Sequence, residues 1–285
     1  MKTMTAMRAA ALTAALFTLP ALALASDGTF DKTLNVSGTV QLEVSTGSGY
    51  VHVNPGSDNQ VHIIGHVHAN HGWMGSTEDQ VQKVVNNPPI EQSGNTIRVG
   101  QMHESWYNHV SIDYDITTPK STHLKAESGS GDLKVVGVNG GVRLETGSGT
   151  VNGDGLGGDG YLQTGSGDIR VNFSNGGSVT AGAGSGSIRL TGVKGGLKAE
   201  TGSGDISIAG QPLDSWKIEA GSGSIDLNLG GSKFTLDAET GSGSIHTDQA
   251  ISMQGSLERH HIVGNVAGGG PTVKVETGSG SIRIH

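Results

Sequence analysis

The sequence contains no cysteine, few aromatic residues and only a modest excess of negative charge. The absence of cysteine excludes disulfides, thiolate metal sites and the lipid-modified cysteine of bacterial lipoproteins. Aromatic residues make up 4% of the chain, which argues against an aromatic stacking surface for sugars or bases. A net charge of −8 argues against nucleic acid or an anionic membrane as the main partner. Stability must therefore come from a packed core without covalent cross-links.

Only the N-terminus carries a long hydrophobic run. A basic segment precedes apolar residues 9–24, which end in the small-residue pattern Ala-Leu-Ala. This combination is typical of a secretory signal peptide, and we expect cleavage before Ser26. A single membrane anchor is the alternative, although the run is short for one. The sequence thus predicts an exported bacterial protein, periplasmic or at the cell surface, with no membrane span in the mature chain.

Glycine is abundant, and it is arranged with a fixed period. The triplet Gly-Ser-Gly occurs nine times, and the spacings from Gly129 to Gly241 are 18, 18, 19, 18, 19 and 20 residues. The first glycines of the triplets are Gly47, Gly129, Gly147, Gly165, Gly184, Gly202, Gly221, Gly241 and Gly278. A near-constant period of this length predicts a solenoid in which each repeat forms one coil.

Apolar residues occupy fixed positions around each triplet, five and three residues before its first glycine and four and six residues after it. The position four after is aliphatic in every repeat: Val51, Leu133, Val151, Ile169, Ile188, Ile206, Ile225, Ile245 and Ile282. Alternation on both sides of the triplet predicts two half-buried strands per coil. We therefore predict an all-β fold, a parallel β-solenoid with 18–19 residues per coil, right-handed by the crossover rule.

The triplet is predicted to form a corner, because the inward-facing parity changes across it. Glycine is expected to supply the unusual backbone angles that such a corner needs. A second break follows the second strand, as in residues 137–141 and 192–196, where one aliphatic residue lies between glycines. Each coil is thus predicted to have two strands and a short third side.

The repeat is interrupted between residues 55 and 120. The patterns there predict strands at 60–68, 96–101 and 110–118, with a short helix over 76–85. Because a solenoid must cover its terminal coils, we interpret this histidine-rich insert as a cap. The predicted organisation is a signal peptide (1–25), first solenoid strands (26–54), the capping insert (55–120) and the Gly-Ser-Gly solenoid (121–285).

The end of the insert and the repeats after it resemble a known family. Residues 110–119 have the sequence VSIDYDITTP, residues 124–127 follow with LKAE, and the pattern ETGSG(D/S)I is then iterated. Over residues 35–285 the chain resembles the bacterial β-strand-repeat family called putative adhesin, domain of unknown function 4097. The resemblance implies an exported or envelope-associated parallel β-solenoid without established enzymatic activity. Its partner is expected to be a protein or polysaccharide of the cell surface or envelope.

Histidines cluster in the insert and form the candidate for a defined ligand site. These are His62, His66, His68 and His71, with His52 nearby. Two of them, His66 and His68, would share one face of a strand. Imidazole nitrogens in this arrangement are suited to zinc, copper or nickel. The alternative is a polar strand surface that binds no metal.

Two further rows of polar residues follow the repeat. Glutamates recur two residues before the triplet, and basic residues recur two positions earlier on the same outward face. Calcium or the basic row can offset the repulsion between stacked carboxylates, and the basic row favours the ion-free interpretation. The threonines before the triplets and the serines within them are expected to bond to the backbone of neighbouring coils, rather than to order water as ice-binding proteins do.

The sequence shows no catalytic constellation. Parallel β-helices include polysaccharide lyases and hydrolases, which need several acidic or basic groups in one groove. Asp132, Asp168 and Asp205 share an offset but not consecutive coils, and aspartate at a turn usually accepts a local backbone hydrogen bond. We predict a non-enzymatic protein without a cofactor, and a polysaccharide-active enzyme is the competing hypothesis.

The last part of the chain departs from the period. The triplets at Gly241 and Gly278 are 37 residues apart, and a charged segment at 257–261 stands where a triplet is expected between them. We interpret this segment as a drifted repeat. The sequence stops at His285 within a strand pattern, which predicts an open C-terminal edge available for self-association.

Overall fold

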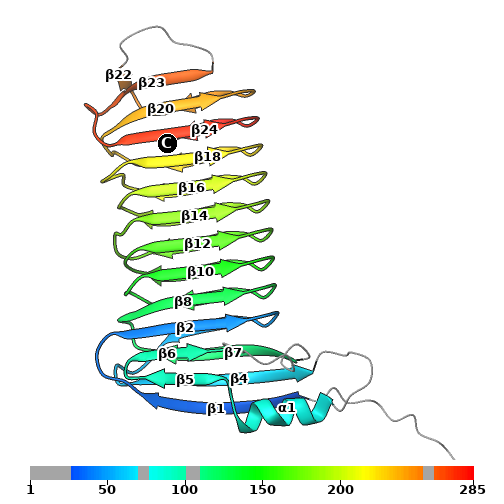
Figure 1. Cartoon of the computed structure of the whole chain (residues 1–285). Coiled ribbons are helices and arrows are strands. Elements are labelled where there is room, and N and C mark those ends of the chain that lie inside the picture. The colour runs from blue at the N-terminus through cyan, green and yellow to red at the C-terminus, as the bar shows by residue number, and fades with distance from the viewer. Residues whose placement is uncertain (1–26, 70–76, 101–109, 253–259) are drawn as a thin grey trace, which may run out of the picture.

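The computed structural model describes residues 27–69, 77–100, 110–252 and 260–285, so the predicted signal peptide lies outside the described residues. The described chain forms a rod of stacked coils (Figure 1). Two sheets run along it: sheet A has 12 strands and sheet B has 13. The fold is the predicted parallel β-solenoid. No helix in these ranges is long and apolar enough to cross a membrane.

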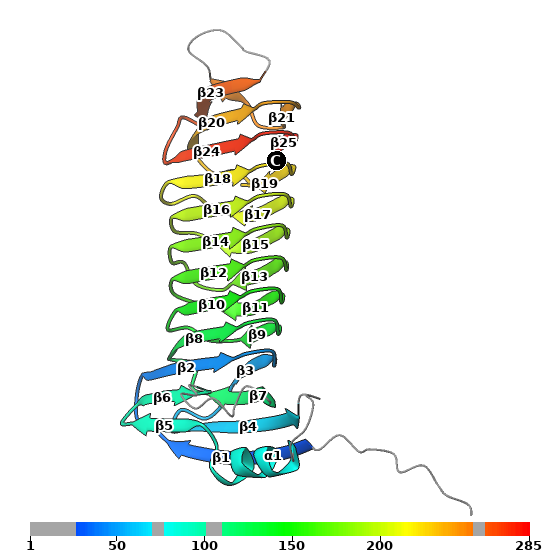
Figure 2. The same ribbon diagram turned by 45° about the vertical axis from the view of Figure 1, so that its right-hand side comes forward.

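Each central coil has one strand in each sheet, joined by a Gly-Ser-Gly corner (Figure 2). Strands of successive coils pair in parallel and in register, so that residues at the same position of the repeat lie side by side. The sheet B strands are β8 (Thr122–Ser128), β10 (Val142–Thr146), β12 (Gly160–Thr164), β14 (Val179–Ala183), β16 (Leu197–Thr201) and β18 (Trp216–Ala220). The sheet A strands are β9 (Leu133–Val136), β11 (Val151–Leu156), β13 (Ile169–Phe173), β15 (Ile188–Val193), β17 (Ile206–Gly210) and β19 (Ile225–Asn228).

The core fills the space between the two sheets. Burial alternates along the strands as predicted, and the aliphatic residues of the third side, such as Val138 and Val193, are also buried. Two glycines interrupt the apolar rows, and neighbouring side chains fill the space. A Cβ on Gly153 would lie 2.6 Å from Leu156 Cδ1, and one on Gly160 would lie 2.9 Å from the Phe173 ring. The apolar rows are therefore continuous even where the repeat pattern breaks.

The Gly-Ser-Gly corners need glycine for a different reason from the one expected. In the described chain, none of the glycines with positive φ belongs to a triplet. Instead, a Cβ on Gly147 would lie 2.3 Å from the carbonyl oxygen of Gly129, and one on Gly149 only 2.0 Å from that of Gly131. The backbones of adjacent coils thus approach too closely for any side chain. Gly47 adjoins a coil without a triplet, and its Cβ would meet nothing within 4 Å.

Buried threonines bond six of the nine corners to a neighbouring coil. Thr146 Oγ1 donates to the carbonyl oxygen of Gly131 at 2.9 Å and accepts from the N–H of Gly149 at 3.1 Å. Thr164 Oγ1 likewise donates to the carbonyl oxygen of Gly149 at 2.9 Å. The predicted role of these hydroxyls as partners of the neighbouring backbone is confirmed. The middle serine of each triplet, by contrast, is exposed to solvent.

The insert contributes a coil to the solenoid as well as a cap. The coil of β2 (Val40–Thr46) and β3 (Val51–Pro55) lies next to the coil of β8 and β9. On its other side lie β6 (Thr96–Val99), parallel to β2, and β7 (Val110–Thr118), parallel to β3. These two strands come from the insert, so the coil they form lies below the coil that precedes it in the sequence (Figure 1).

Antiparallel strands close this end of the rod. In sheet A, β4 (Gln60–Ala69) pairs antiparallel with β7, and β1 (Asp27–Asn35) pairs antiparallel with β4. In sheet B, β5 (Ile90–Ser93) pairs antiparallel with β6. The predicted helix is present as α1 (Thr77–Asn86) and packs against β1 near Gly28. The cap therefore includes β1, a strand from the segment expected to begin the solenoid.

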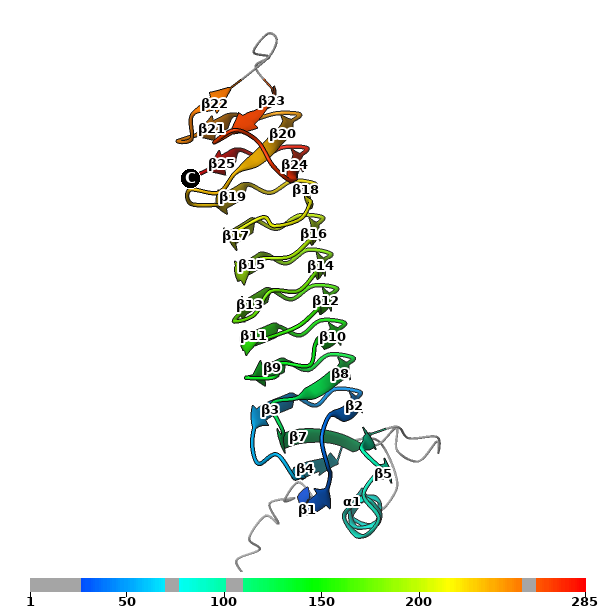
Figure 3. The same cartoon turned by 90° about the vertical axis from the view of Figure 1, so that its left-hand side faces the viewer.

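The C-terminal strands do not form an open edge, so this prediction is wrong. The last coil consists of β24 (Thr272–Thr277) and β25 (Ile282–Ile284). Strand β24 lies between β18 and β20 (Phe234–Thr240), and β25 lies between β19 and β21 (Ile245–Thr247), all in parallel. The end of the chain is thus enclosed by coils on both sides (Figure 3).

The segment between the last two triplets is not a drifted repeat. Strand β23 (His261–Val266) pairs antiparallel with β20, and the short β22 (Ile251–Ser252) pairs antiparallel with β23. Most of the charged segment at 257–261 lies outside the described residues. Between β23 and β24 the chain reverses through Ala267, Gly268 and Gly269, which all have positive φ. These antiparallel strands cover the distal edge of sheet B.

Candidate functional site

Imidazoles and carboxylates gather on the outward side of sheet A at the capped end. Strands β1, β4, β7 and β3 are neighbours there. Inward burial of Val61, Ile63 and Val67 turns the alternate residues of β4 toward solvent. We call the resulting surface the His–Asp face; its members are His52, His62, His66, His68, Asp27, Asp31, Asp113 and Asp115.

Asp115 is the centre of the His–Asp face. Its carboxylate lies 3.3 Å from His52 Nδ1 and 3.3 Å from His66 Nε2, at opposite oxygens. Tyr50 Oη donates to Oδ2 of Asp115 at 3.0 Å, and the Tyr50 ring stacks on His52 with centroids 4.2 Å apart. Burial, followed by Asp115 and Asp113, raises the pKa of Tyr50 to about 12. The phenol therefore stays protonated at neutral pH and remains a hydrogen-bond donor.

The other histidines of the face contact different aspartates. His68 lies between Asp27 and Asp113, with one ring nitrogen 3.1 Å from each carboxylate. His62 Nε2 lies 2.8 Å from Asp31 Oδ1. These contacts tie β1, β4 and β7 together on their outward side. The cap is thus held by polar contacts outside as well as by its apolar core.

The structure does not bring the predicted metal ligands together at one point. His66 and His68 share one face of β4, as expected, and His62 lies on the same face, but each of the three has a different aspartate partner. His71 lies outside the described residues. Within the described ranges, no three histidine, aspartate or glutamate side chains are arranged to hold a metal ion. The aspartate partners were missed from the sequence, although Asp113 and Asp115 alternate with buried residues in a way that predicts a shared face.

The outward side of sheet B carries a second polar surface, which we call the Lys–Glu ladder. Lys198 Nζ lies 2.8 Å from Glu200 Oε1 on the same strand, and Lys217 Nζ lies 2.8 Å from Glu219 Oε2. The same pairing occurs in β8, β10 and β24, with arginine in β10. The hydrogen bond from Lys198 lowers the pKa of Glu200, while Glu200 raises the pKa of Lys198. The basic row thus accompanies the glutamates, as predicted.

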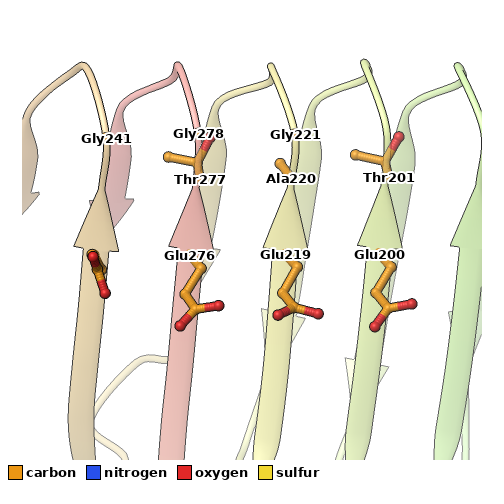
Figure 4. A pocket seen from close by; sticks show the side chains of 10 residues that line it. Glu200, Thr201, Glu219, Ala220, Gly221, Gly241, Glu276, Thr277 and Gly278 are labelled. Atoms are coloured by element: carbon orange, nitrogen blue, oxygen red, sulfur yellow. The ribbon is translucent and has the colours of Figure 1, made fainter.

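A shallow groove of about 700 Å³ follows the distal part of the Lys–Glu ladder. Four carboxylates line it, from Glu200, Glu219, Glu276 and Glu239 in neighbouring strands. Figure 4 shows those of Glu200, Glu219 and Glu276 in one row across neighbouring strands. Strand β20 carries Asp237 where β16, β18 and β24 carry lysine, and Asp237 pairs with His261 at 2.9 Å. The groove therefore becomes more acidic toward the distal end.

Comparison with known proteins identifies one family. Residues 37–285 match the model of the family described as Toastrack DUF4097. No curated protein matches the chain.

Three solved structures align with most of the chain at low identity. A putative cell adhesion protein from Clostridium sporogenes is 15% identical, with 90% of this chain and 99% of that chain covered and a TM-score of 0.31. A putative adhesin from Bacteroides fragilis is 15% identical, with 90% and 97% covered and a TM-score of 0.45. A putative lipid binding protein from Parabacteroides distasonis is 13% identical, with 90% and 96% covered and a TM-score of 0.33. Similarity at this level does not indicate a ligand or a partner for this chain.

Proposed function

This chain belongs to the Toastrack DUF4097 family, and we propose that it is an exported, non-enzymatic binding module of the bacterial envelope. In this role it acts as an adhesin-like rod that contacts an extended envelope polysaccharide. The single observation that supports the proposal most is the Lys–Glu ladder, which repeats paired charges on one outward sheet face. The pairs form two groups, in β8 and β10 and in β16, β18 and β24, separated by β12 and β14, which carry Tyr161 with Gln163 and Thr180 with Gly182 at these positions. Within a group neighbouring pairs are about 4.8 Å apart, so a linear polymer can make several equivalent weak contacts with each group.

Binding of purified protein to isolated envelope polysaccharide, measured by co-sedimentation, tests the proposal. The test variant replaces Lys198, Lys217 and Lys274 with glutamine, which removes three charges from the Lys–Glu ladder. The matched control removes three charges from the outward side of sheet A with Arg170→Gln, Arg189→Gln and Arg283→Gln. We expect the ladder variant to bind about tenfold more weakly, since exposed ionic contacts contribute a few tenths of a kcal/mol each.

Equal loss in both variants would show that the contact is only an effect of net charge, and no binding by the unchanged protein would reject the polysaccharide partner. A polysaccharide-active enzyme is the competing hypothesis. Release of reducing ends or unsaturated products from the same polysaccharide would support it. Export is tested separately by mass spectrometry of the secreted protein, which should begin at Ser26.

Transition-metal binding by the His–Asp face is a second candidate function, and it requires side chains of this face to move, because the described structure has no three of them arranged around a metal position. The observation that favours it is the 3.3 Å distance from Asp115 to both His52 and His66. Two ligands at about 2.0–2.1 Å from a tetrahedral zinc ion lie at a similar distance from each other. Metal would have to turn the Asp115 carboxylate and replace its contacts with these histidines, so we expect binding no tighter than micromolar.

Isothermal titration with zinc, copper, nickel and calcium tests this second function. The test variant is His52→Ala with His66→Ala, and the control is His62→Ala, whose partner is Asp31. Transition-metal binding that is lost in the double variant and kept in the control would assign the ion to Asp115 and its two histidines. Flat titrations of the unchanged protein would reject the hypothesis.

A further inference from the structure

The terminal coil is the part of the solenoid whose sequence order and spatial order differ most. Strands β20 and β21 are made before β24 and β25, yet the later pair lies between the earlier pair and the rest of the rod. In the described strand pairing, residues 234–252 therefore stack on the rod through the C-terminal coil. Gln249 Nε2 also donates to the carbonyl oxygen of Gly230, in the loop after β19, at 2.9 Å. Removing the C-terminal coil from the structure would leave a slot one coil thick between β18–β19 and β20–β21. We call it the terminal slot.

Contacts on both sides of the terminal slot show how completely the C-terminal coil fills it. Val273, Val275, Ile282 and Ile284 are fully buried. On one side, Thr277 Oγ1 donates to the carbonyl oxygen of Gly223 at 2.7 Å. On the other side, Thr240 Oγ1 donates to that of Gly280 at 2.8 Å. An empty slot would expose apolar residues and two unpaired parallel edges, so it has a strong tendency to take up a coil of matching pattern.

The loop that delivers the C-terminal coil is strained. It runs from β23 to β24 as Ala-Gly-Gly-Gly-Pro over residues 267–271. Ala267 has φ of 50°, and it is the only residue other than glycine with positive φ in the described parts of the chain. A side chain in this region of backbone space costs about 1 kcal/mol or more. An extended conformation of the same loop would release this strain and carry the coil away from its own rod.

Polar contacts link the end of the chain to both sides of the terminal slot. The imidazole of His285 lies 2.8 Å from Asp248 on one side of the slot and 3.4 Å from Asp226 on the other. His246 also contacts Asp248, at 3.1 Å. All these groups are exposed to solvent, so the contacts contribute little to holding the coil.

We propose that residues 272–285 are exchangeable between molecules, so that the C-terminal coil of one copy fills the terminal slot of a second copy. The partner is another copy of this chain because the slot takes a coil with two alternating apolar strands around a Gly-Ser-Gly corner. Every contact within the slot is then preserved, while the strained loop opens. Exchange of an identical element is a low-cost route to a dimer. This inference does not depend on the proposed envelope function.

Disulfide trapping in the full-length chain tests the exchange, since the protein has no cysteine of its own. Ser244 belongs to the coil of β20 and β21, and Ser281 belongs to the C-terminal coil next to it. Their hydroxyl oxygens are 3.3 Å apart. One copy carries Ser244→Cys and the other Ser281→Cys. The two are unfolded, mixed, refolded and oxidised, and the products are separated without reductant. We expect a disulfide-linked heterodimer in clear excess over either homodimer.

A matched pair in the middle of the rod is the control. Arg189 and Ser207 are register partners in consecutive coils, where no slot exists. The mixture of Arg189→Cys and Ser207→Cys chains should give only the links formed by random collision. Exchange holds the cysteines at an effective concentration in the millimolar range, so at about 10 μM protein the test pair should link about 100-fold faster.

A single chain with both Ser244→Cys and Ser281→Cys shows whether the geometry and the fold persist. It should form its own disulfide and remain a monomer by light scattering. If this chain closes its disulfide but the mixed chains link no faster than the control pair, the coil is not exchanged and the proposal is wrong. If the doubly substituted chain itself links mainly between molecules, exchange is supported even without mixing.

Discussion

The middle of the rod and its two ends are built on different principles. From the coil of β10 and β11 to that of β18 and β19, each coil stacks on the coil that precedes it in the sequence. At the N-terminal end the coil of β6 and β7 lies below the earlier coil of β2 and β3. At the C-terminal end the coil of β24 and β25 lies beneath the earlier pair β20 and β21. At the N-terminal end the later coil is therefore farther from the middle of the rod than the earlier one, and at the C-terminal end it is closer to the middle.

The difference follows from how each coil satisfies its backbone. A central coil has an equivalent coil on both sides, so every strand finds the same partners, and the repeat period alone specifies its neighbours. An end coil has one unpaired edge, which must be covered to avoid association with other chains. Antiparallel strands β1, β4 and β5 cover one end, and β22 and β23 cover sheet B at the other. Substitutions at the same position of the repeat should therefore have different effects on stability in the middle of the rod and at its ends.

The largest difference is expected at the corner glycines. Gly147→Ala places a Cβ 2.3 Å from a backbone oxygen of the neighbouring coil, whereas Gly47→Ala meets nothing within 4 Å. We expect the first to lower the free energy of unfolding by about 3 kcal/mol and the second by less than about 1 kcal/mol. Urea denaturation followed by circular dichroism measures both. Similar losses would show that the triplet needs glycine for backbone conformation after all.

The next largest effect shows whether the C-terminal coils unfold locally or together with the rest of the rod. Ile206 and Ile282 occupy the same position of the repeat, one in the middle of the rod and the other in the terminal coil, and both are fully buried. Replacing either with alanine should cost about 2–5 kcal/mol. We expect Ile282→Ala to increase hydrogen exchange mainly in β20 to β25, and Ile206→Ala to affect coils on both sides of β17. The same exchange pattern in both variants would contradict opening of β20 to β25 independently of the rest of the rod.

A smaller effect is expected from the buried threonines. Thr164→Val keeps the shape of the side chain but removes the hydrogen bond to the Gly149 carbonyl oxygen. It should lower the free energy of unfolding by about 1–2 kcal/mol, measured by urea denaturation. Ala220 stands at the same position in β18 without a hydroxyl. Ala220→Val is therefore the control, since it places the same valine side chain at this position without removing a hydrogen bond.

The smallest effect is a pH dependence confined to the C-terminal end. Hydrogen bonds to Asp248 and then Asp226 raise the pKa of His285 above 6.5, and His285 lowers the pKa of Asp248 below 3.8. The contribution of the histidine is complete below pH 6.5 and is lost as the pH rises through its raised pKa. The contribution of the aspartate is present above pH 3.8 and is lost as the pH falls through its lowered pKa. The end should therefore be held best between these two values.

Hydrogen exchange of β25 at pH 6 and pH 8.5, corrected for the intrinsic dependence of exchange on pH, measures this effect. His285→Gln should remove the difference, while His62→Gln at the other end of the rod should leave it unchanged. A difference that persists in His285→Gln would assign the pH dependence to other groups, of which His246 is the nearest.

The candidate sites show how far sequence reasoning reaches in this protein. The strand periodicity correctly placed His66 and His68 on one face, because side chains alternate along any strand. The contact of His52 with Asp115 depends on β3 pairing with β7, which lies 55 or more residues later in the chain. The Lys–Glu ladder was predictable because its partners are two residues apart on one strand.

The sequence by itself determined the coil: its length, its two strands, its inward residues and its Gly-Ser-Gly corner. These features are local, since each repeat contains the alternation and the corner that it needs. The tertiary structure alone decided which coils are neighbours at the ends, and it also revealed that the triplet glycines are required by close stacking and not by positive φ. The physical reason is that all coils present nearly the same edge. A repeat therefore specifies how to stack but not which repeat it stacks on.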